Sequence, residues 1–296
     1  MIQTVQSGNQ LSARDRRAND MEIVPLGAML GAEIRGLDLT DKIDQGQSEA
    51  LNAALMAQKV LVFRDQDITS DQHLAFGRMF GEVTIHPFVP HLPEMPEMLV
   101  LDNHQDNPVL STDMWHSDET FREEPPMGSI LRCREMPPVG GDTMWADMTA
   151  ALGGLSDKMQ GFLSGLEAIH DFKPFRRRFA GLPVKERHEK LAEFEERYPN
   201  PVHPVVTTHP VTGDKVLFIN EQFTLAIKDM REDESRTLLD FLFTLPRIPE
   251  YQFRLSWEKN TIAFWDNRPT QHYAANDYFP QRRTMHRITI KGVRPN

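Results

Sequence analysis

The stretch MWHSDETF, residues 114–121, places an imidazole and a carboxylate two positions apart, at His116 and Asp118. A second imidazole, His272 in IAFWDNRPTQHYA, follows an apolar run and a polar turn. If the first stretch is extended, period-two alternation turns both of its side chains to one face, where a histidine from a second strand could complete three corners of an octahedron. Such a set holds iron(II) and leaves three positions for a co-substrate and O₂. Spacing alone nevertheless favours the alternative that both histidines make only local hydrogen bonds.

Two arginines in QRRTMHRITIKG, Arg283 and Arg287, share a face if this segment is a strand, roughly 13 Å apart at about 3.3 Å per residue. Guanidinium groups bind carboxylates and oxyanions in a bidentate manner. One arginine could therefore hold a dicarboxylate co-substrate and the other an anionic substrate, on either side of a metal. The alternative is a pair of surface salt bridges, which is the role we expect for Arg282 and His286 on the opposite face.

The composition limits the partners of the chain. With 33 Lys+Arg against 43 Asp+Glu, the formal net charge is −10, which argues against binding to nucleic acid or to an anionic membrane. Cys133 is the only cysteine, so neither an intrachain disulfide nor a cysteine zinc site can form, and a reducing, cytoplasmic location is expected. No apolar run approaches the roughly 18 residues of a membrane span. We expect a small anionic substrate and a homo-oligomer.

The elements that must position these residues are mostly short. We expect a disordered tail over residues 1–20 and a single domain over 21–296. Helical patterns, two of them capped by Ser70 and Ser156, cover residues 47–59, 70–80, 156–166, 186–198 and 232–245. Strand patterns cover residues 60–63, 98–101, 129–133, 251–257 and 287–292, and residues 209–220 predict a hairpin that turns near 212–214. This pattern predicts a mainly β fold with helical insertions (α+β), an antiparallel sandwich or jelly roll.

Six motifs, in this order, together resemble the taurine dioxygenase family: WHSD, GGDTMWAD, HPVVTTHPVTG, LFINEQFT, WDNRPTQHYA and PQRRTMHRITI. The similarity runs from about residue 24 to residue 293. It implies a double-stranded β-helix, or jelly roll, and a dioxygenase that uses Fe(II), 2-oxoglutarate and O₂. It also implies that His116, Asp118 and His272 form the iron triad.

The resemblance assigns further roles position by position. Arg283 matches the arginine that pairs with the far carboxylate of 2-oxoglutarate, and Thr143 in GGDT matches the hydroxyl that assists it. Arg287 matches the residue that binds the substrate sulfonate, and His86 in IHPF matches the histidine that helps it. Phe223 in NEQF matches an aromatic wall of the substrate pocket.

One departure from the family concerns the sulfonate itself. In taurine enzymes a small apolar residue follows the iron-binding aspartate, and its backbone N–H contacts the sulfonate. In this chain that residue is Glu119. Strand alternation should turn its side chain away from the face of Asp118, so that the N–H remains available. A side chain turned inward would repel the anion.

Other departures concern the substrate tail. The tyrosine expected after His86 is replaced by Val89, and the polar residues that meet the amine of taurine are replaced by Ser111, Thr112 and Asp113. These changes favour an apolar tail, although Asp113 could pair with an amine. The basic run KPFRRRF, residues 173–179, is a candidate lid, or else a solvated face.

The resemblance predicts hydroxylation of a small organosulfonate such as taurine beside its sulfur, which releases sulfite and an aldehyde together with succinate and CO₂. Relatives that share the WHSD and WDN patterns leave two alternatives, an alkyl-sulfate dioxygenase and an aryloxyalkanoate (phenoxy acid) dioxygenase. A third alternative is a non-catalytic jelly roll that senses a small anion. The intact triad together with Arg283 argues against this third alternative.

Overall fold

The computed structural model describes residues 21–107 and 113–296, without the side chains of residues 177 and 178. The predicted tail, residues 1–20, lies outside the described residues. The largest sheet in the described part has nine strands, of which β4 (Val83–Thr84) pairs with β17. The other eight follow the order β1 (Glu22–Pro25), β2 (Ala32–Arg35), β3 (Val60–Phe63), β15 (Ile262–Asp266), β7 (Gly128–Glu135), β17 (Arg283–Ile290), β6 (Met95–Asn103) and β5 (His91–Leu92).

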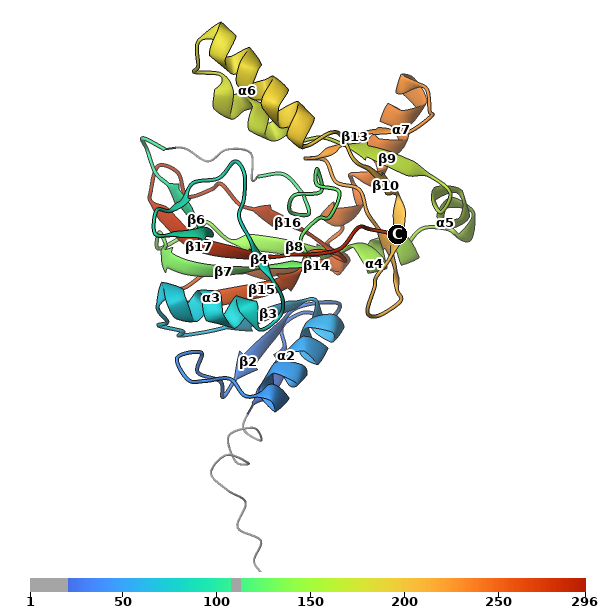
Figure 1. The fold of residues 1–296 in the computed structure, drawn as a ribbon. Coiled ribbons are helices and arrows are strands. Elements are labelled where there is room, and N and C mark those ends of the chain that lie inside the picture. Colours follow the sequence, from blue (N-terminus) through green and yellow to red (C-terminus); the bar gives the residue numbers. More distant parts are fainter. Residues whose placement is uncertain (1–20, 108–112) are drawn as a thin grey trace, which may run out of the picture.

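Smaller antiparallel sheets complete the fold (Figure 1). The first consists of β14 (Gln252–Leu255), β8 (Thr143–Asp147) and β16 (Thr270–Ala274). The second consists of β10 (Val202–Pro204), β9 (Glu167–His170) and β13 (Thr224–Ile227). The predicted hairpin forms with its turn and second strand where expected, in β12 (Lys215–Leu217), but its first strand, β11 (Val206–Thr208), lies just before the predicted range.

The central strands of the large sheet are buried on both faces, as alternation along β15 shows. Ile262 and Phe264 belong to the core that includes residues of α2 (Gln45–Gln58) and α3 (Ser70–Arg78), which cover this face of the sheet (Figure 1). Trp265 points to the other face, where its ring centroid lies 5.7 Å from that of Trp145 in β8. The sheet that carries β8 therefore packs against the large sheet, and the fold is rich in β-structure with helical insertions, as predicted.

The remaining helical segments lie away from the helix-covered face of the large sheet (Figure 1). They are α4 (Met148–Gly153), α5 (Asp157–Leu163), η1 (Lys173–Phe179), α6 (Val184–Arg197), α7 (Glu232–Leu242), η2 (Leu245–Arg247) and η3 (Pro249–Tyr251). Ser156 caps α5 as predicted, but α3 is capped by Thr69 and not by Ser70. The reason is a capping box, in which Thr69 and Gln72 each satisfy the backbone N–H of the other.

Within the described residues, no helix combines the length and the apolar character that a membrane crossing requires.

Candidate active site

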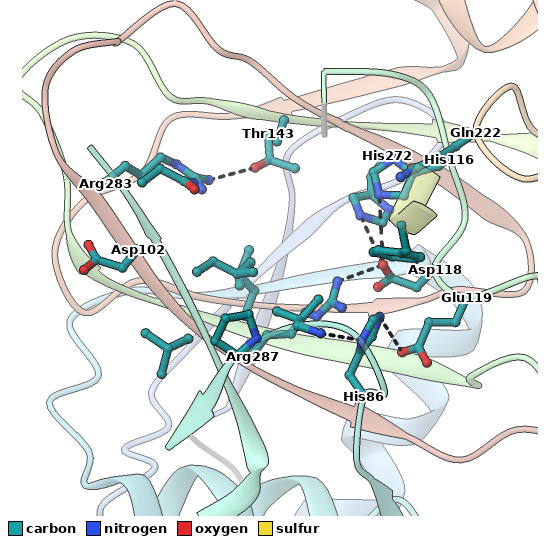
Figure 2. Close-up of a pocket in the computed structure, with 18 of the residues that line it drawn as sticks. His86, Asp102, His116, Asp118, Glu119, Thr143, Gln222, His272, Arg283 and Arg287 are labelled. Carbon is teal, nitrogen blue, oxygen red and sulfur yellow. Dashed lines mark hydrogen bonds and ion pairs between the residues drawn. The ribbon is translucent and has the colours of Figure 1, made fainter. Parts of the chain in front are cut away.

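The structure brings together His116, Asp118 and His272. Their ligand atoms all lie within 4.8 Å of one another, and all three residues are buried (Figure 2). His272 belongs to β16, and His116 joins it in an isolated antiparallel bridge, with backbone N···O distances of 3.0 and 2.7 Å. The predicted convergence of the three residues is confirmed. The extended stretch is shorter than expected, however, because the chain turns at Asp118.

The hydrogen bonds and charges of the three residues suit a divalent metal. Nδ1 of His116 lies 2.8 Å from the carbonyl oxygen of Met114, so it carries the proton and leaves the Nε2 lone pair for a metal. Burial lowers the pKa of both His116 and His272, which keeps them neutral. Although burial opposes ionisation of Asp118, the guanidinium of Arg287 and a hydrogen bond from Ser129 hold the pKa of its carboxyl below its usual range. Two neutral imidazoles and one carboxylate are the donor set that iron(II) takes in oxygenases.

Ser129 and Asn267 hold the carboxylate and the backbone of Asp118, respectively. Ser129 donates from Oγ to Oδ2 of Asp118 at 2.8 Å, which leaves Oδ1 directed toward the two imidazoles. Asn267 accepts from the Asp118 backbone N–H at 2.7 Å and donates to its carbonyl oxygen at 3.0 Å. The sequence predicted Asn267 only as part of a turn. Its place in the WDN motif was the signal that it also holds the metal-ligand loop.

A second polar group surrounds Arg283, on the opposite side of the cavity (Figure 2). Arg283 donates from Nε to the carbonyl oxygen of Gly141 at 3.1 Å and from Nη2 to Oγ1 of Thr143 at 3.5 Å. The indole N–H of Trp257 donates to the same Thr143 oxygen at 3.0 Å. Because this oxygen accepts two hydrogen bonds, the hydroxyl proton of Thr143 is available to donate to a carboxylate. Trp257 was not predicted as a site residue.

The third group lies near the triad and contains Arg287 and His86. Arg287 donates from Nη1 to Oδ1 of Asp118 at 2.7 Å. Nδ1 of His86 accepts from the backbone N–H groups of Phe88 and Val89 at 3.0 and 3.1 Å. The proton of a neutral His86 therefore sits on Nε2, which lines the cavity wall 3.9 Å from Oε1 of Glu119.

The expected orientation of Glu119 was wrong. Residues 118–121 form a turn in which Glu119 has a φ of 51°, so strand alternation does not apply. Its side chain points inward and is 1% exposed. Oε2 lies 2.6 Å from Nε of Arg122, an ion pair without the alignment of a hydrogen bond. Burial raises the pKa of Glu119, and Arg122 opposes this shift.

One cavity of about 150 Å³ joins these groups. It is lined by all nine predicted site residues, His86, His116, Asp118, Glu119, Thr143, Phe223, His272, Arg283 and Arg287. Its apolar wall includes Val89, Val100, Leu101 and Phe175. The burial of Arg283 and Arg287 excludes the surface salt-bridge alternative, whereas Arg282 does pair with Asp102 at the surface, as expected.

The segment considered as a lid forms η1 and supplies Phe175 to the cavity wall. The ring of Phe175 stacks on that of Phe223, with centroids 6.0 Å apart. Arg176 pairs with Asp171 and Glu195, each at 2.9 Å. η1 therefore contributes an aromatic side chain to the site. Asp113 is exposed and does not line the cavity, while Ser111 and Thr112 lie outside the described residues.

A family model for the taurine catabolism dioxygenase TauD, TfdA family matches residues 22–289. The alpha-ketoglutarate-dependent sulfate ester dioxygenase of Pseudomonas putida is 36% identical over 293 residues, which cover 97% of this chain and 95% of that protein. The alpha-ketoglutarate-dependent sulfonate dioxygenase of Saccharomyces cerevisiae is 33% identical, over 93% of this chain and 68% of that protein. A solved taurine dioxygenase structure from Burkholderia xenovorans matches with a TM-score of 0.79 and 34% identity, over 93% of this chain and 91% of that one. The chain therefore belongs to the TauD/TfdA family of dioxygenases, which use iron(II), O₂ and 2-oxoglutarate (alpha-ketoglutarate).

Proposed function

We propose that this dioxygenase oxidises an organic sulfonate or sulfate ester at the carbon beside the sulfo group. The observation that carries the proposal is the composition of the cavity, which places the His–Asp–His set and two buried arginines next to an apolar wall. The similarity to the sulfate ester and sulfonate dioxygenases supports the same substrate class.

The proposed residue roles follow from the three groups of contacts. His116, Asp118 and His272 hold the iron, which when bound supplies the O₂ chemistry that removes hydrogen from carbon. Arg283 binds the far carboxylate of 2-oxoglutarate, and the hydroxyl proton of Thr143 donates to the same carboxylate.

At the substrate end, Arg287 and the Nε2–H of His86 bind the sulfo group, together with the backbone N–H of Glu119. Phe223 and Phe175 pack against the tail, with Val89 where a tyrosine was expected. Burying an apolar tail against such a wall contributes about 25 cal/mol per Å². We therefore propose that taurine is accepted but that a longer alkyl or aryl sulfonate or sulfate ester gives an equal or higher kcat/KM.

The reaction balances for both head groups. One oxygen atom of O₂ enters the C–H bond as a hydroxyl group, and the other enters succinate as 2-oxoglutarate loses CO₂. The hydroxylated carbon of a sulfonate then expels sulfite, whereas that of a sulfate ester expels sulfate, and an aldehyde forms in both cases. The released anion therefore identifies the substrate class.

Two structural proposals accompany this function. The large sheet and the β14–β8–β16 sheet, packed through Trp145 and Trp265, are proposed to form a jelly roll that spans a single domain over residues 21–296. The cytoplasmic location and the homo-oligomer remain predictions, and size-exclusion chromatography with light scattering tests the second.

The test is a substrate comparison with iron(II) and 2-oxoglutarate, in which succinate, sulfite and sulfate are quantified. Taurine, pentanesulfonate, hexyl sulfate and phenoxyacetate are supplied separately under one set of conditions. We expect stoichiometric succinate and sulfite or sulfate from the two apolar sulfo compounds. Turnover of phenoxyacetate alone would replace the proposal by an aryloxyalkanoate dioxygenase. A preference for taurine above roughly tenfold, worth about 1.4 kcal/mol, would contradict the apolar tail site.

A further inference from the structure

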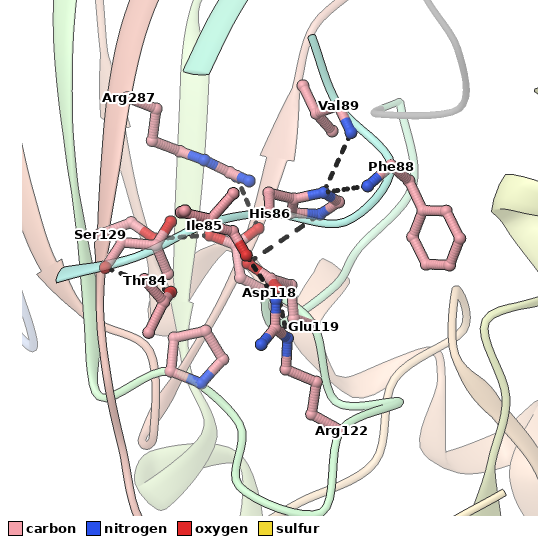
Figure 3. A network of polar contacts seen from close by, with 12 residues as sticks. Thr84, Ile85, His86, Phe88, Val89, Asp118, Glu119, Arg122, Ser129 and Arg287 are labelled. Atoms are coloured by element: carbon pink, nitrogen blue, oxygen red, sulfur yellow. Dashed lines mark hydrogen bonds and ion pairs between the residues drawn. The ribbon is translucent and has the colours of Figure 1, made fainter. Parts of the chain in front are cut away.

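We infer that Glu119 is a specificity-determining residue that restricts the head-group site to ligands with a single negative charge. This inference rests on the proposed function and concerns the same site. Figure 3 shows the network that carries it, in which Glu119 lies between His86 and Arg122, beside Asp118 and close to Arg287.

The position of Glu119 is built into the fold. The backbone N–H of Arg122 donates to the Glu119 carbonyl oxygen at 3.0 Å and closes the turn, and Glu119 adopts the left-handed conformation there. That conformation costs a non-glycine residue roughly 1–2 kcal/mol, so contacts must hold it. The guanidinium of Arg122 provides one such contact, and it is anchored in turn by donation to the carbonyl oxygen of Ile85 at 3.1 Å.

The carboxylate of Glu119 stands where an anion must bind. Oε1 lies 3.9 Å from Nε2 of His86, and neither carboxylate oxygen has a hydrogen-bond donor among the described residues. A sulfo group that accepts from His86 and Arg287 must therefore approach within a few ångströms of a negative charge. This arrangement weakens anion binding, and it weakens dianion binding more, because the Coulomb energy scales with the ligand charge.

The charges around the cavity balance when one monoanion is present. The two positive charges of iron(II) and the one of Arg283 neutralise three negative charges, those of the Asp118 carboxylate and of the two carboxylates of 2-oxoglutarate. Asp102 is matched by Arg282 and Glu119 by Arg122. Counted this way, one positive charge is left over at Arg287, whose Nη1 also donates to the iron-binding carboxylate of Asp118 at 2.7 Å.

A sulfonate or a sulfate monoester supplies the single charge that Arg287 requires. A phosphate monoester carries nearly two charges at pH 8, since its second pKa is about 6. The second charge would be buried without a partner of opposite charge, which is unfavourable away from bulk water. Replacing Glu119 by a neutral residue leaves Arg122 unmatched and so provides that partner.

The experiment compares hexyl sulfate with hexyl phosphate, two ligands with the same tail. Their dissociation constants are measured by calorimetry at pH 8 with Mn(II) in place of iron(II) and N-oxalylglycine in place of 2-oxoglutarate, so that no turnover occurs. We expect wild type to prefer hexyl sulfate by at least tenfold. Glu119→Gln should reduce this preference at least tenfold, or about 1.4 kcal/mol.

Three controls separate charge from structure. Arg122→Gln should weaken the binding of both ligands and increase the preference for hexyl sulfate. The double variant that also carries Glu119→Gln should return this preference to within about threefold of wild type. Glu123→Gln, an exposed neighbour paired with Arg294, should change nothing. Unchanged N-oxalylglycine binding in each variant shows that the fold is intact.

The outcomes distinguish this inference from the proposed function. If hexyl sulfate binds and both ligands respond equally to Glu119→Gln, or if wild type binds the phosphate as tightly as the sulfate, the inference is wrong and the proposed function stands. If neither hexyl sulfate nor pentanesulfonate binds wild type, the proposed function is wrong and the inference with it.

Discussion

The two ends of the cavity are built differently. At the Arg283 end, hydrogen bonds connect Arg283, Thr143 and Trp257, and among these three side chains the positive charge stands alone. At the Arg287 end, positive and negative groups alternate, and polar atoms of Glu119 and Arg287 have no hydrogen-bond partner within the described part of the chain.

The difference follows from what each end is proposed to bind. The co-substrate is the same molecule in every turnover, so the residues that bind it can be preorganised in the free enzyme. A buried polar atom without a partner costs roughly 1–3 kcal/mol, and a ligand that supplies the partner recovers this energy. Substrate selection is therefore expected at the Arg287 end, where such atoms remain, and changes at the Arg283 end should affect all substrates alike.

The largest effect is expected for a substitution in the metal triad, on which turnover depends whichever ligand occupies the two ends. Asp118→Asn should lower 2-oxoglutarate turnover by roughly a thousandfold or more and weaken Mn(II) binding, because the only carboxylate of the triad is lost. Asp102→Asn is the matched control, since it changes the same side chain in the wall of the same cavity and should retain turnover within severalfold. Near-normal turnover of Asp118→Asn would remove Asp118 from the triad.

The next largest effect concerns the co-substrate end. Arg283→Met should weaken 2-oxoglutarate binding by about 2–5 kcal/mol, because one partner of a buried charge pair is lost. The 2-oxoglutarate concentration that the enzyme requires should therefore rise at least about thirtyfold. Arg282→Met, one residue earlier and exposed, should leave the requirement unchanged. Titration of 2-oxoglutarate at saturating sulfo substrate measures both. Equal effects of the two variants would contradict the assignment of Arg283.

A smaller effect is expected at Thr143. Thr143→Val removes the hydroxyl that donates to the co-substrate carboxylate, and a hydrogen bond to a charged group contributes about 1.5–3 kcal/mol. We expect roughly a tenfold or greater rise in the 2-oxoglutarate dissociation constant. Thr143→Ser keeps the hydroxyl and should stay close to wild type. If the valine and serine variants behave alike, the hydroxyl has no part in binding.

The smallest effect is expected in the tail region. Val89→Tyr adds a hydroxyl group to the wall and should raise kcat/KM for taurine relative to pentanesulfonate by a few fold, without a change in the 2-oxoglutarate requirement. Val89→Phe adds a similar ring without the hydroxyl and serves as control. A shift toward taurine in both variants would indicate pocket shape as the cause.

The sequence predicted the metal site well and the substrate end less well, for physical reasons. Two histidines and an aspartate in family motifs identify a metal-binding set by residue type, whatever backbone conformation carries them. The side-chain direction of Glu119 depends on one left-handed φ, which no pattern of residue types in its neighbourhood encodes. Trp257 reaches Thr143 only because β14 pairs with β8, a contact between segments more than one hundred residues apart.

The same distinction holds for the fold. The uniformly apolar run at residues 60–63 was predicted with the bounds that β3 has, because a strand buried on both faces needs no alternation. β8 was missed because its five residues mix polar and apolar side chains, and all but one of them are buried. β17 starts at Arg283, earlier than the predicted strand, since its arginines face a cavity and not solvent.

The division of the cavity into two ends is tested most directly by one set of titrations. Arg283→Met and Arg287→Met are each titrated with N-oxalylglycine and with hexyl sulfate in the presence of Mn(II). We predict that Arg283→Met loses at least about thirtyfold in N-oxalylglycine affinity, and that Arg287→Met retains that affinity but loses at least about thirtyfold in hexyl sulfate affinity. An exchange of the two results, or an equal loss of both ligands in both variants, would contradict the account.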